Sequence, residues 1–117
     1  MDATKIDALH AAGIDYASGV ERFGGNNAMF EKFVLRFLED PLFDELQGHI
    51  ETQNAKQAFR CAHTLKGLVG NLSFTHYFEA VSKLSDALQD NNFEEVLIIM
   101  PSVTQAHDKV MRALREI

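Results

Sequence analysis

The spacing of apolar residues between positions 55 and 72 constrains the fold more than any other feature of the chain. Along the sequence, successive members of the set are three or four positions apart: Ala55, Ala58, Ala62, Leu65, Val69 and Leu72. An α-helix advances by about 100° per residue, so this spacing places the whole set on one face. We therefore predict an amphipathic helix over residues 54–72 that buries this face against other helices.

Comparable apolar spacing recurs in the rest of the chain, between short turn signals. The expected helical segments lie within residues 13–23, 28–38, 42–50, 54–72, 74–88 and 93–117. Asn54 and Ser73 are the expected N-caps of the two helices in the middle of the chain, because their side-chain oxygens accept bonds from free backbone amides. Pro101 predicts a kink in the last helix, or its division in two.

Turn-forming residues are too scarce for a many-stranded β fold, because the chain has only 2 prolines and 7 glycines. Short connections between amphipathic helices favour antiparallel neighbours. We predict an all-α fold with one domain over residues 1–117, an antiparallel up-and-down four-helix bundle with a short N-terminal helical cover. The apolar stripes are expected to form its core, above all through Phe30, Phe37, Phe78 and Leu84.

Composition excludes several classes of function. The net charge of -6 disfavours binding to nucleic acid or to anionic membranes, which reward clustered Lys and Arg. The longest strongly apolar run, Val96–Met100, is far shorter than the ~20 residues of a membrane-spanning helix. A single cysteine and the lack of a secretory signal favour a cytoplasmic protein, and a monomer is the simplest expectation. The start at Met1 and the end soon after the last helix favour a free-standing protein over a module of a larger protein.

His63 is expected on the solvent side of the helix over residues 54–72, about 130° from the centre of its apolar face at the helical step. Gly67 and Gly70 follow at i+4 and i+7, on the same side as His63. Each glycine weakens a helix interior by roughly 1 kcal/mol relative to alanine. Three cations lie nearby in the sequence, namely Lys56, Arg60 and Lys66.

An exposed imidazole beside a helix surface without side chains suits attack on a phosphoryl group. Neutral imidazole is a nucleophile near physiological pH. Neighbouring cations favour this neutral form and neutralise incoming anionic oxygens. The bare surface gives a second protein room to bring its phosphorylated residue within bonding distance, and phosphoryl transfer depends mostly on such positioning.

The stretch His63-Thr64-Leu65-Lys66-Gly67, followed by Asn71-Leu72, resembles the H-x-L-K-G-x-x-x-x-L-G signature of histidine-containing phosphotransfer (HPt) domains. Upstream, Gly13-Ile14-Asp15 and Glu21–Gly25 resemble the entry segment of that family. The resemblance covers residues from about 13 to 115. One difference is that Ser73 replaces the final glycine of the signature, and we interpret it as the N-cap of the next helix.

This resemblance implies a role for each matching position. His63 would carry the phosphoryl group on Nε2 and exchange it with an aspartate of a response-regulator receiver domain. Lys66 would help to neutralise the phosphoryl group, and Gly67 would leave room for the receiver. The surrounding positions would form the docking surface: Lys56, Arg60, Thr64 and Gly70. The implied partners are receiver domains and a sensor or hybrid histidine kinase, with no cofactor on this chain and Mg²⁺ on the receiver.

Other chemistries lack their sequence signals. The five histidines are scattered, with no H-x-x-x-H or C-x-x-C pair for a metal site. The four histidines other than His63 are expected at the surface or at the bundle edge. Neither a P-loop nor a G-x-S-x-G motif is present, so we do not expect an autonomous kinase or a hydrolase of that class. The alternative that remains is a helical docking module that binds a signalling partner without covalent phosphorylation. The upstream kinase, the downstream regulator and the direction of phosphoryl flow are left open by the sequence.

Overall fold

Helices and short turns account for the whole chain in the computed structural model, which describes residues 1–117. The elements are α1 Ala3–Ala11, α2 Tyr16–Arg22, α3 Asn27–Arg36, the 3₁₀ turn η1 Phe37–Glu39, α4 Leu42–Glu51, α5 Ala55–Asn71, α6 Thr75–Gln89 and α7 Phe93–Arg115. Extended pairing is limited to one isolated bridge between Ile14 and Phe74. The prediction of an all-α fold is confirmed.

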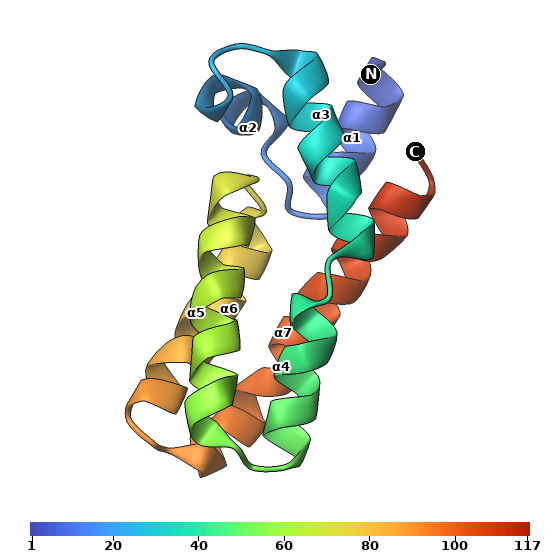
Figure 1. Ribbon diagram of the computed structural model, residues 1–117. Helices are drawn as coiled ribbons and strands as arrows, with labels where there is room; N and C mark the ends of the chain where they lie inside the picture. The colour runs from blue at the N-terminus through green and yellow to red at the C-terminus, as the bar shows by residue number, and fades with distance from the viewer.

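The last four α-helices form the bundle. In Figure 1, α4, α5, α6 and α7 run alternately down and up, and α1, α2 and α3 lie together at one end. α5 packs between α4 and α6, and α6 packs against α7. The ring of Phe43 on α4 stacks on His107 of α7 with centroids 3.8 Å apart, which closes the bundle. The expected N-terminal cover is present, and it includes α1, which the sequence analysis did not assign.

The predicted apolar face of α5 is the buried face. Ala58, Ala62, Leu65 and Val69 are completely buried, Leu72 is nearly so, and Ala55 is half-buried. The expected core residues Phe30, Phe37 and Leu84 are also buried. Apart from Ala55, these residues belong to one continuous hydrophobic cluster that all four bundle helices share.

Three aromatic or aliphatic residues of the predicted stripes are instead exposed. Phe78, which we expected in the core, is 38% exposed, because the buried face of α6 runs through Tyr77, Val81 and Leu84. Phe33 on α3 and Leu97 on α7 are likewise exposed. Each lies one position before or after a buried residue, and a step of about 100° carries its side chain to the edge of the buried face.

Side-chain caps begin most of the helices. The Asn54 side chain accepts a hydrogen bond from the Gln57 amide at 3.2 Å, as predicted for the start of α5. Asp2, Asp15, Asn26 and Asn92 cap α1, α2, α3 and α7 in the same way. Of the two outcomes predicted for Pro101, a kink or a division of the last helix, the division does not occur, because α7 continues through Pro101. Proline removes the hydrogen bond to the carbonyl of Leu97, and Leu97 lies on the exposed side of α7.

The prediction that Ser73 caps α6 is wrong. Ser73 follows the end of α5 in a left-handed conformation, with φ of 58°. Its amide donates to the Gly70 carbonyl at 3.1 Å, and the Phe74 amide donates to the Val69 carbonyl at 2.9 Å. This pair of bonds is a Schellman motif, in which the left-handed position favours glycine. The α6 N-cap is Phe74, which makes no side-chain capping bond.

The segment Gly13-Ile14-Asp15 packs against the same turn. The Asp15 amide donates to the Ser73 carbonyl at 2.9 Å, and the Thr75 amide donates to the Gly13 carbonyl at 2.8 Å. Gly13 has a φ of +83°, and a Cβ atom there would fall 2.5 Å from the His76 ring. These contacts attach the N-terminal cover to the α5–α6 connection.

Candidate functional site

Helix α5 places His63 on its exposed face, opposite the buried residues. His63 is exposed, whereas Ala62 beside it is completely buried, as the helical spacing predicted. The ring of Phe59, one turn earlier, lies 5.9 Å from the His63 ring between centroids, at an angle of 36°. Phe59 is half-buried and packs on the core. The imidazole therefore stands in solvent beside an anchored aromatic ring.

Gly67 leaves open space one turn beyond His63. A Cβ atom built at Gly67 would have no heavy atom within 4 Å, apart from its own helix backbone and chain neighbours. Gly67 is exposed. No packing contact in the chain therefore requires glycine at this position, and its absent side chain leaves the surface next to His63 clear.

Gly70 is in a different environment, because it lies under the Phe78 ring of α6. A Cβ atom at Gly70 would come within 3.1 Å of Cδ2 of that ring. The Lys66 ammonium lies over the same ring, with Nζ 5.8 Å from the centroid. Lys66 is half-buried, between His63 and the buried face of α5. The structure thus brings Lys66, Gly70 and Phe78 together, and the sequence analysis had not connected Phe78 with the site.

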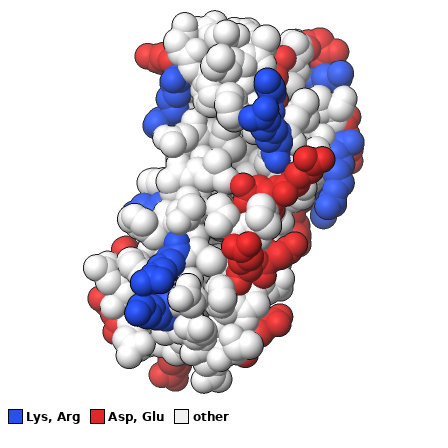
Figure 2. Space-filling model, in the orientation of Figure 1, with Lys and Arg blue, Asp and Glu red and all other residues white.

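The other predicted docking residues, Lys56, Arg60 and Thr64, are all exposed on α5. The Thr64 hydroxyl donates to the Arg60 carbonyl at 3.0 Å, within the helix. Figure 2 shows Lys and Arg side chains over the N-terminal half of α5 and Asp and Glu side chains over α4. The surface over the C-terminal half of α5 is mostly uncharged in that view. The candidate site therefore lies where a basic area meets an uncharged one.

His107 lies at the edge of the bundle, within the range of positions expected for it, but it makes more contacts than a solvated histidine. Its ring is half-buried, stacks on Phe43 and contacts Phe37. Its Nδ1 atom and the Tyr77 hydroxyl are 2.8 Å apart, in hydrogen-bonding contact. Burial lowers the pKa of His107, against the opposing influence of Asp108 and Asp44. This histidine helps to hold α4, α6 and α7 together.

Other reactive groups do not assemble into a second centre. Burial, with a smaller contribution from Glu45, raises the pKa of the Cys61 thiol, which opposes formation of the nucleophilic thiolate. No group of three or more His, Cys, Asp and Glu residues is placed to hold a metal ion. None of the helices has both the length and the apolar character needed to cross a membrane.

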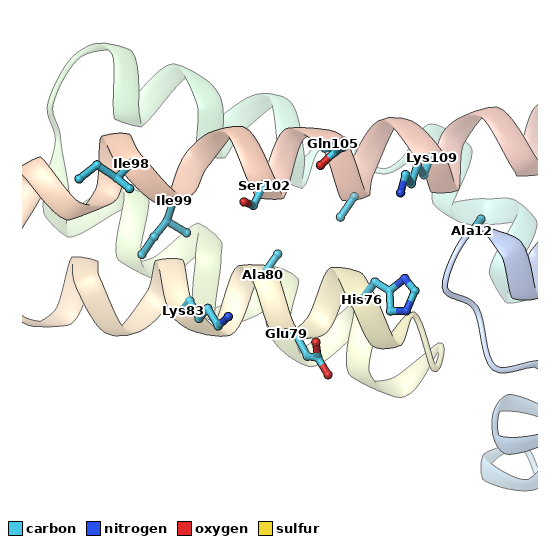
Figure 3. A pocket seen from close by; sticks show the side chains of 11 residues that line it. Ala12, His76, Glu79, Ala80, Lys83, Ile98, Ile99, Ser102, Gln105 and Lys109 are labelled. Carbon is cyan, nitrogen blue, oxygen red and sulfur yellow. The ribbon is translucent and has the colours of Figure 1, made fainter.

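A groove of about 390 Å³ lies between α6 and α7 (Figure 3). Small side chains such as Ala80 and Ser102 lie between the two helices, and the ionic side chains of Lys83, Glu79 and Lys109 lie around them. None of the predicted site residues lines this groove. The surface around His63 is therefore separate from it, on α5 and the adjoining side of α6.

Comparison with known protein families gives a match over more than half of the chain. Residues 35–114 match the model of a protein family described as the Hpt domain. The matched range contains all the predicted site residues and the four bundle helices except Arg115 at the end of α7. The Gly13-Ile14-Asp15 and Glu21–Gly25 stretches lie before it. Searches of curated proteins and of solved structures gave no significant match. The match covers more than half of the chain, so the protein belongs to the Hpt domain family, and this membership implies histidine phosphotransfer in a phosphorelay.

Proposed function

We propose that this protein relays phosphoryl groups between aspartates of response-regulator receiver domains and that His63 is the residue that carries the group. One observation carries the assignment to His63. Its exposed imidazole stands one turn from Gly67, where the surface has no side chain and no neighbouring atoms that would block an approaching protein. None of the other histidines has an exposed helix glycine at i+4.

The proposed transfer is a displacement at phosphorus. The lone pair of the neutral imidazole, on Nε2 of His63, forms the new P–N bond as the P–O bond to the receiver aspartate breaks. The aspartate leaves as a carboxylate and keeps the electron pair of the broken bond. Nδ1 keeps its proton, so the phosphorylated ring is cationic until that proton is lost to water. The reverse sequence returns the phosphoryl group to an aspartate, and no external oxidant or nucleotide takes part.

The residues around His63 are proposed to position the partner and to neutralise the charge of the phosphoryl group, while His63 forms the bond to phosphorus. The Lys66 ammonium, one turn from His63, is the proposed partner for the oxygens of the phosphoryl group. Arg60 and Lys56 extend the positive area toward the start of α5 and would meet acidic groups on a receiver. Mg²⁺ is proposed to be held by the receiver, as the resemblance to HPt domains implies.

The uncharged surface beside His63 supports docking of a folded partner. Phe78 is 38% exposed and lies next to Gly70, within one turn of Gly67. Burial of such exposed apolar groups under a partner stabilises the complex. We propose that a receiver domain covers this surface while its phosphorylated aspartate faces His63, and that a sensor or hybrid histidine kinase begins the relay.

The test is a transfer assay with purified receiver domains carrying labelled phosphate. Incubation with the wild-type chain should give a base-stable, acid-labile phosphate on the protein, and His63→Gln should give none. His10→Gln is the matched control, because His10 is also an exposed helix residue but lies on α1. If His63→Gln still binds receivers while even the wild type gains no phosphate, the protein is a docking module. If His63→Gln is labelled as fast as the wild type, another residue is the acceptor.

A further inference from the structure

We infer that Phe78 is a positioning residue that holds the Lys66 ammonium for transfer at His63, and that Gly70 is the residue that lets the Phe78 ring lie there. This inference rests on the proposed function, because it assigns Lys66 to the phosphoryl group. It concerns a residue of α6 that the sequence places outside the signature. It also gives Gly70 a purpose that differs from that of Gly67.

The first observation is the unusual position of the Phe78 ring. An aromatic side chain on a bundle helix is normally buried, yet Phe78 is 38% exposed while Tyr77 beside it is completely buried. The ring does not extend freely into water. It lies on the backbone of α5 at Gly70, where even a Cβ atom would come within 3.1 Å of Cδ2 and 3.2 Å of Cε2. Even alanine at this position would force the ring to shift by a few tenths of an ångström.

The second observation is the cation above the ring. Lys66 lies one turn before Gly70 on α5, and its Nζ atom lies 5.8 Å from the Phe78 centroid. This separation is within the ~6 Å at which an ammonium is attracted by the face of an aromatic ring. No salt bridge within the chain holds Lys66, since the only ion pair present joins the N-terminus to Glu31. The aromatic ring is therefore the contact that restrains the ammonium.

A restraint on Lys66 matters because lysine is flexible. A free lysine side chain samples many rotamers, and its ammonium is at any one place for only part of the time. Lys66 is at i+3 from His63, so both side chains leave α5 on neighbouring faces. Holding the ammonium over Phe78 keeps it on the α6 side of His63, while the open Gly67 surface remains clear for the receiver. The restrained ammonium then loses less rotamer freedom when it meets the phosphoryl group.

The effect expected from this restraint is modest and specific. A cation–π contact at an exposed site is worth ~0.5–1 kcal/mol, which corresponds to a factor of about two to five in rate. Phe78→Leu keeps an apolar side chain over Gly70 but removes the aromatic face, so transfer to His63 should slow by about that factor. Phe78→Tyr keeps the aromatic face and should recover most of the transfer rate that Phe78→Leu loses.

The decisive measurement is a double-mutant cycle with Lys66→Met, read as the rate of phosphohistidine formation from a phosphorylated receiver. If Phe78 acts through Lys66 in addition to its part in docking, Phe78→Leu slows transfer less in the Lys66→Met background than in the wild type. If Phe78→Leu slows transfer equally in both backgrounds, the ring acts by direct contact with the receiver, and the inference is overturned. Equal rates for Phe78→Leu and the wild type would overturn it as well.

Phe33→Leu provides the matched control. Phe33 is also 38% exposed, and the guanidinium of Arg36 lies over its ring at 5.0 Å, but it is on α3. This variant should transfer at the wild-type rate. The outcome also separates this inference from the proposed function. If the wild-type chain gains no phosphate, the proposed function is contradicted. If the wild-type chain is phosphorylated normally but Phe78→Leu slows transfer equally with and without Lys66→Met, only the role of Phe78 is contradicted.

Discussion

Replacement of Gly67 by glutamine should stabilise the protein and impair its proposed activity, and these opposite effects make it the most informative substitution. Gly67 lies inside α5, is exposed, and has no neighbouring atom within 4 Å of a Cβ position. Glutamine is a good helix former, whereas glycine is disfavoured by about 1 kcal/mol relative to alanine. With no clash to offset this gain, Gly67→Gln should raise the free energy of unfolding by about 0.5–1 kcal/mol. The midpoint of thermal unfolding should then rise by about 2–6 °C.

The same side chain should obstruct a docking receiver. It would fill the space one turn from His63, so the receiver aspartate could no longer approach the imidazole as closely. A misplacement of about 1 Å in a reacting complex can lower a rate by about a hundredfold. Transfer from a phosphorylated receiver should therefore slow by an order of magnitude or more, and Gly67→Ala should fall between the wild type and Gly67→Gln.

Gly48→Gln is the control for both effects. Gly48 lies inside α4, is exposed, and also has nothing within 4 Å of a Cβ position. It should show a comparable gain in stability with an unchanged transfer rate. The reasoning about Gly67 is refuted if Gly67→Gln transfers at the wild-type rate with several receivers. It is also refuted if Gly67→Gln is less stable than the wild type, because the open space would then not exist.

Changes at three other positions have defined outcomes. His63→Gln should alter the free energy of unfolding by no more than about 0.5 kcal/mol, because His63 is exposed, and urea denaturation would reveal any larger loss. Ser73→Gly should be about 1–2 kcal/mol more stable than Ser73→Ala in the same assay, because the backbone φ of 58° at this position favours glycine. Both variants lose the 3.2 Å hydrogen bond to the Ser18 hydroxyl, so that loss does not affect the comparison. Equal stability of the two variants would contradict the left-handed conformation at Ser73. The lowered pKa of His107 means that the folded state resists its protonation, so stability should be full above about pH 6.5 and decrease as the pH falls below it. Urea denaturation of the wild type and His107→Gln at several pH values checks this, and identical pH dependence in both would contradict it.

The sequence predicts the orientation of α5 well, because one physical constraint decides it. Apolar residues three and four positions apart can be buried together on only one side of a helix, so the side that carries His63 and Gly67 must face away from the core. The Asn54 cap is equally local, since the donor and the acceptor lie three residues apart. The position of the candidate site on the surface therefore follows from residues 54–72 alone.

Features that depend on a second helix could not be predicted in the same way. Phe78 has the spacing of a core residue within α6, but its ring lies at the edge of the buried face and packs on the α5 backbone at Gly70, where no side chain is in the way. His107 is half-buried because Phe37, Phe43 and Tyr77 converge on it from three other elements. In both cases the deciding contacts join residues that lie far apart or on different elements, and a helical wheel carries no information about them.

Ser73 shows how two local signals can compete. A serine before a new helix is a common N-cap, but a residue directly after a helix end is also a common left-handed position. The surrounding hydrogen bonds decide between them. The Phe74 amide closes the end of α5 on Val69, and the Ser73 carbonyl accepts from Asp15 of the N-terminal segment. Both bonds require the turn to be tight, and the left-handed residue is what makes it tight.

The position of this turn bears on how the candidate site would work. The N-terminal cover is attached at the C-terminal end of α5, through Gly13-Ile14-Asp15, and α1, α2 and α3 lie at that end of the bundle (Figure 1). Nothing from the cover comes within 4 Å of a Cβ position at Gly67. No lid therefore has to move before a receiver can reach His63, and the helix that presents the imidazole is fixed by a buried face and a tight turn. A site of this kind favours partners that dock as rigid bodies, and differences between receivers would then lie in how well their surfaces fit α5 and Phe78.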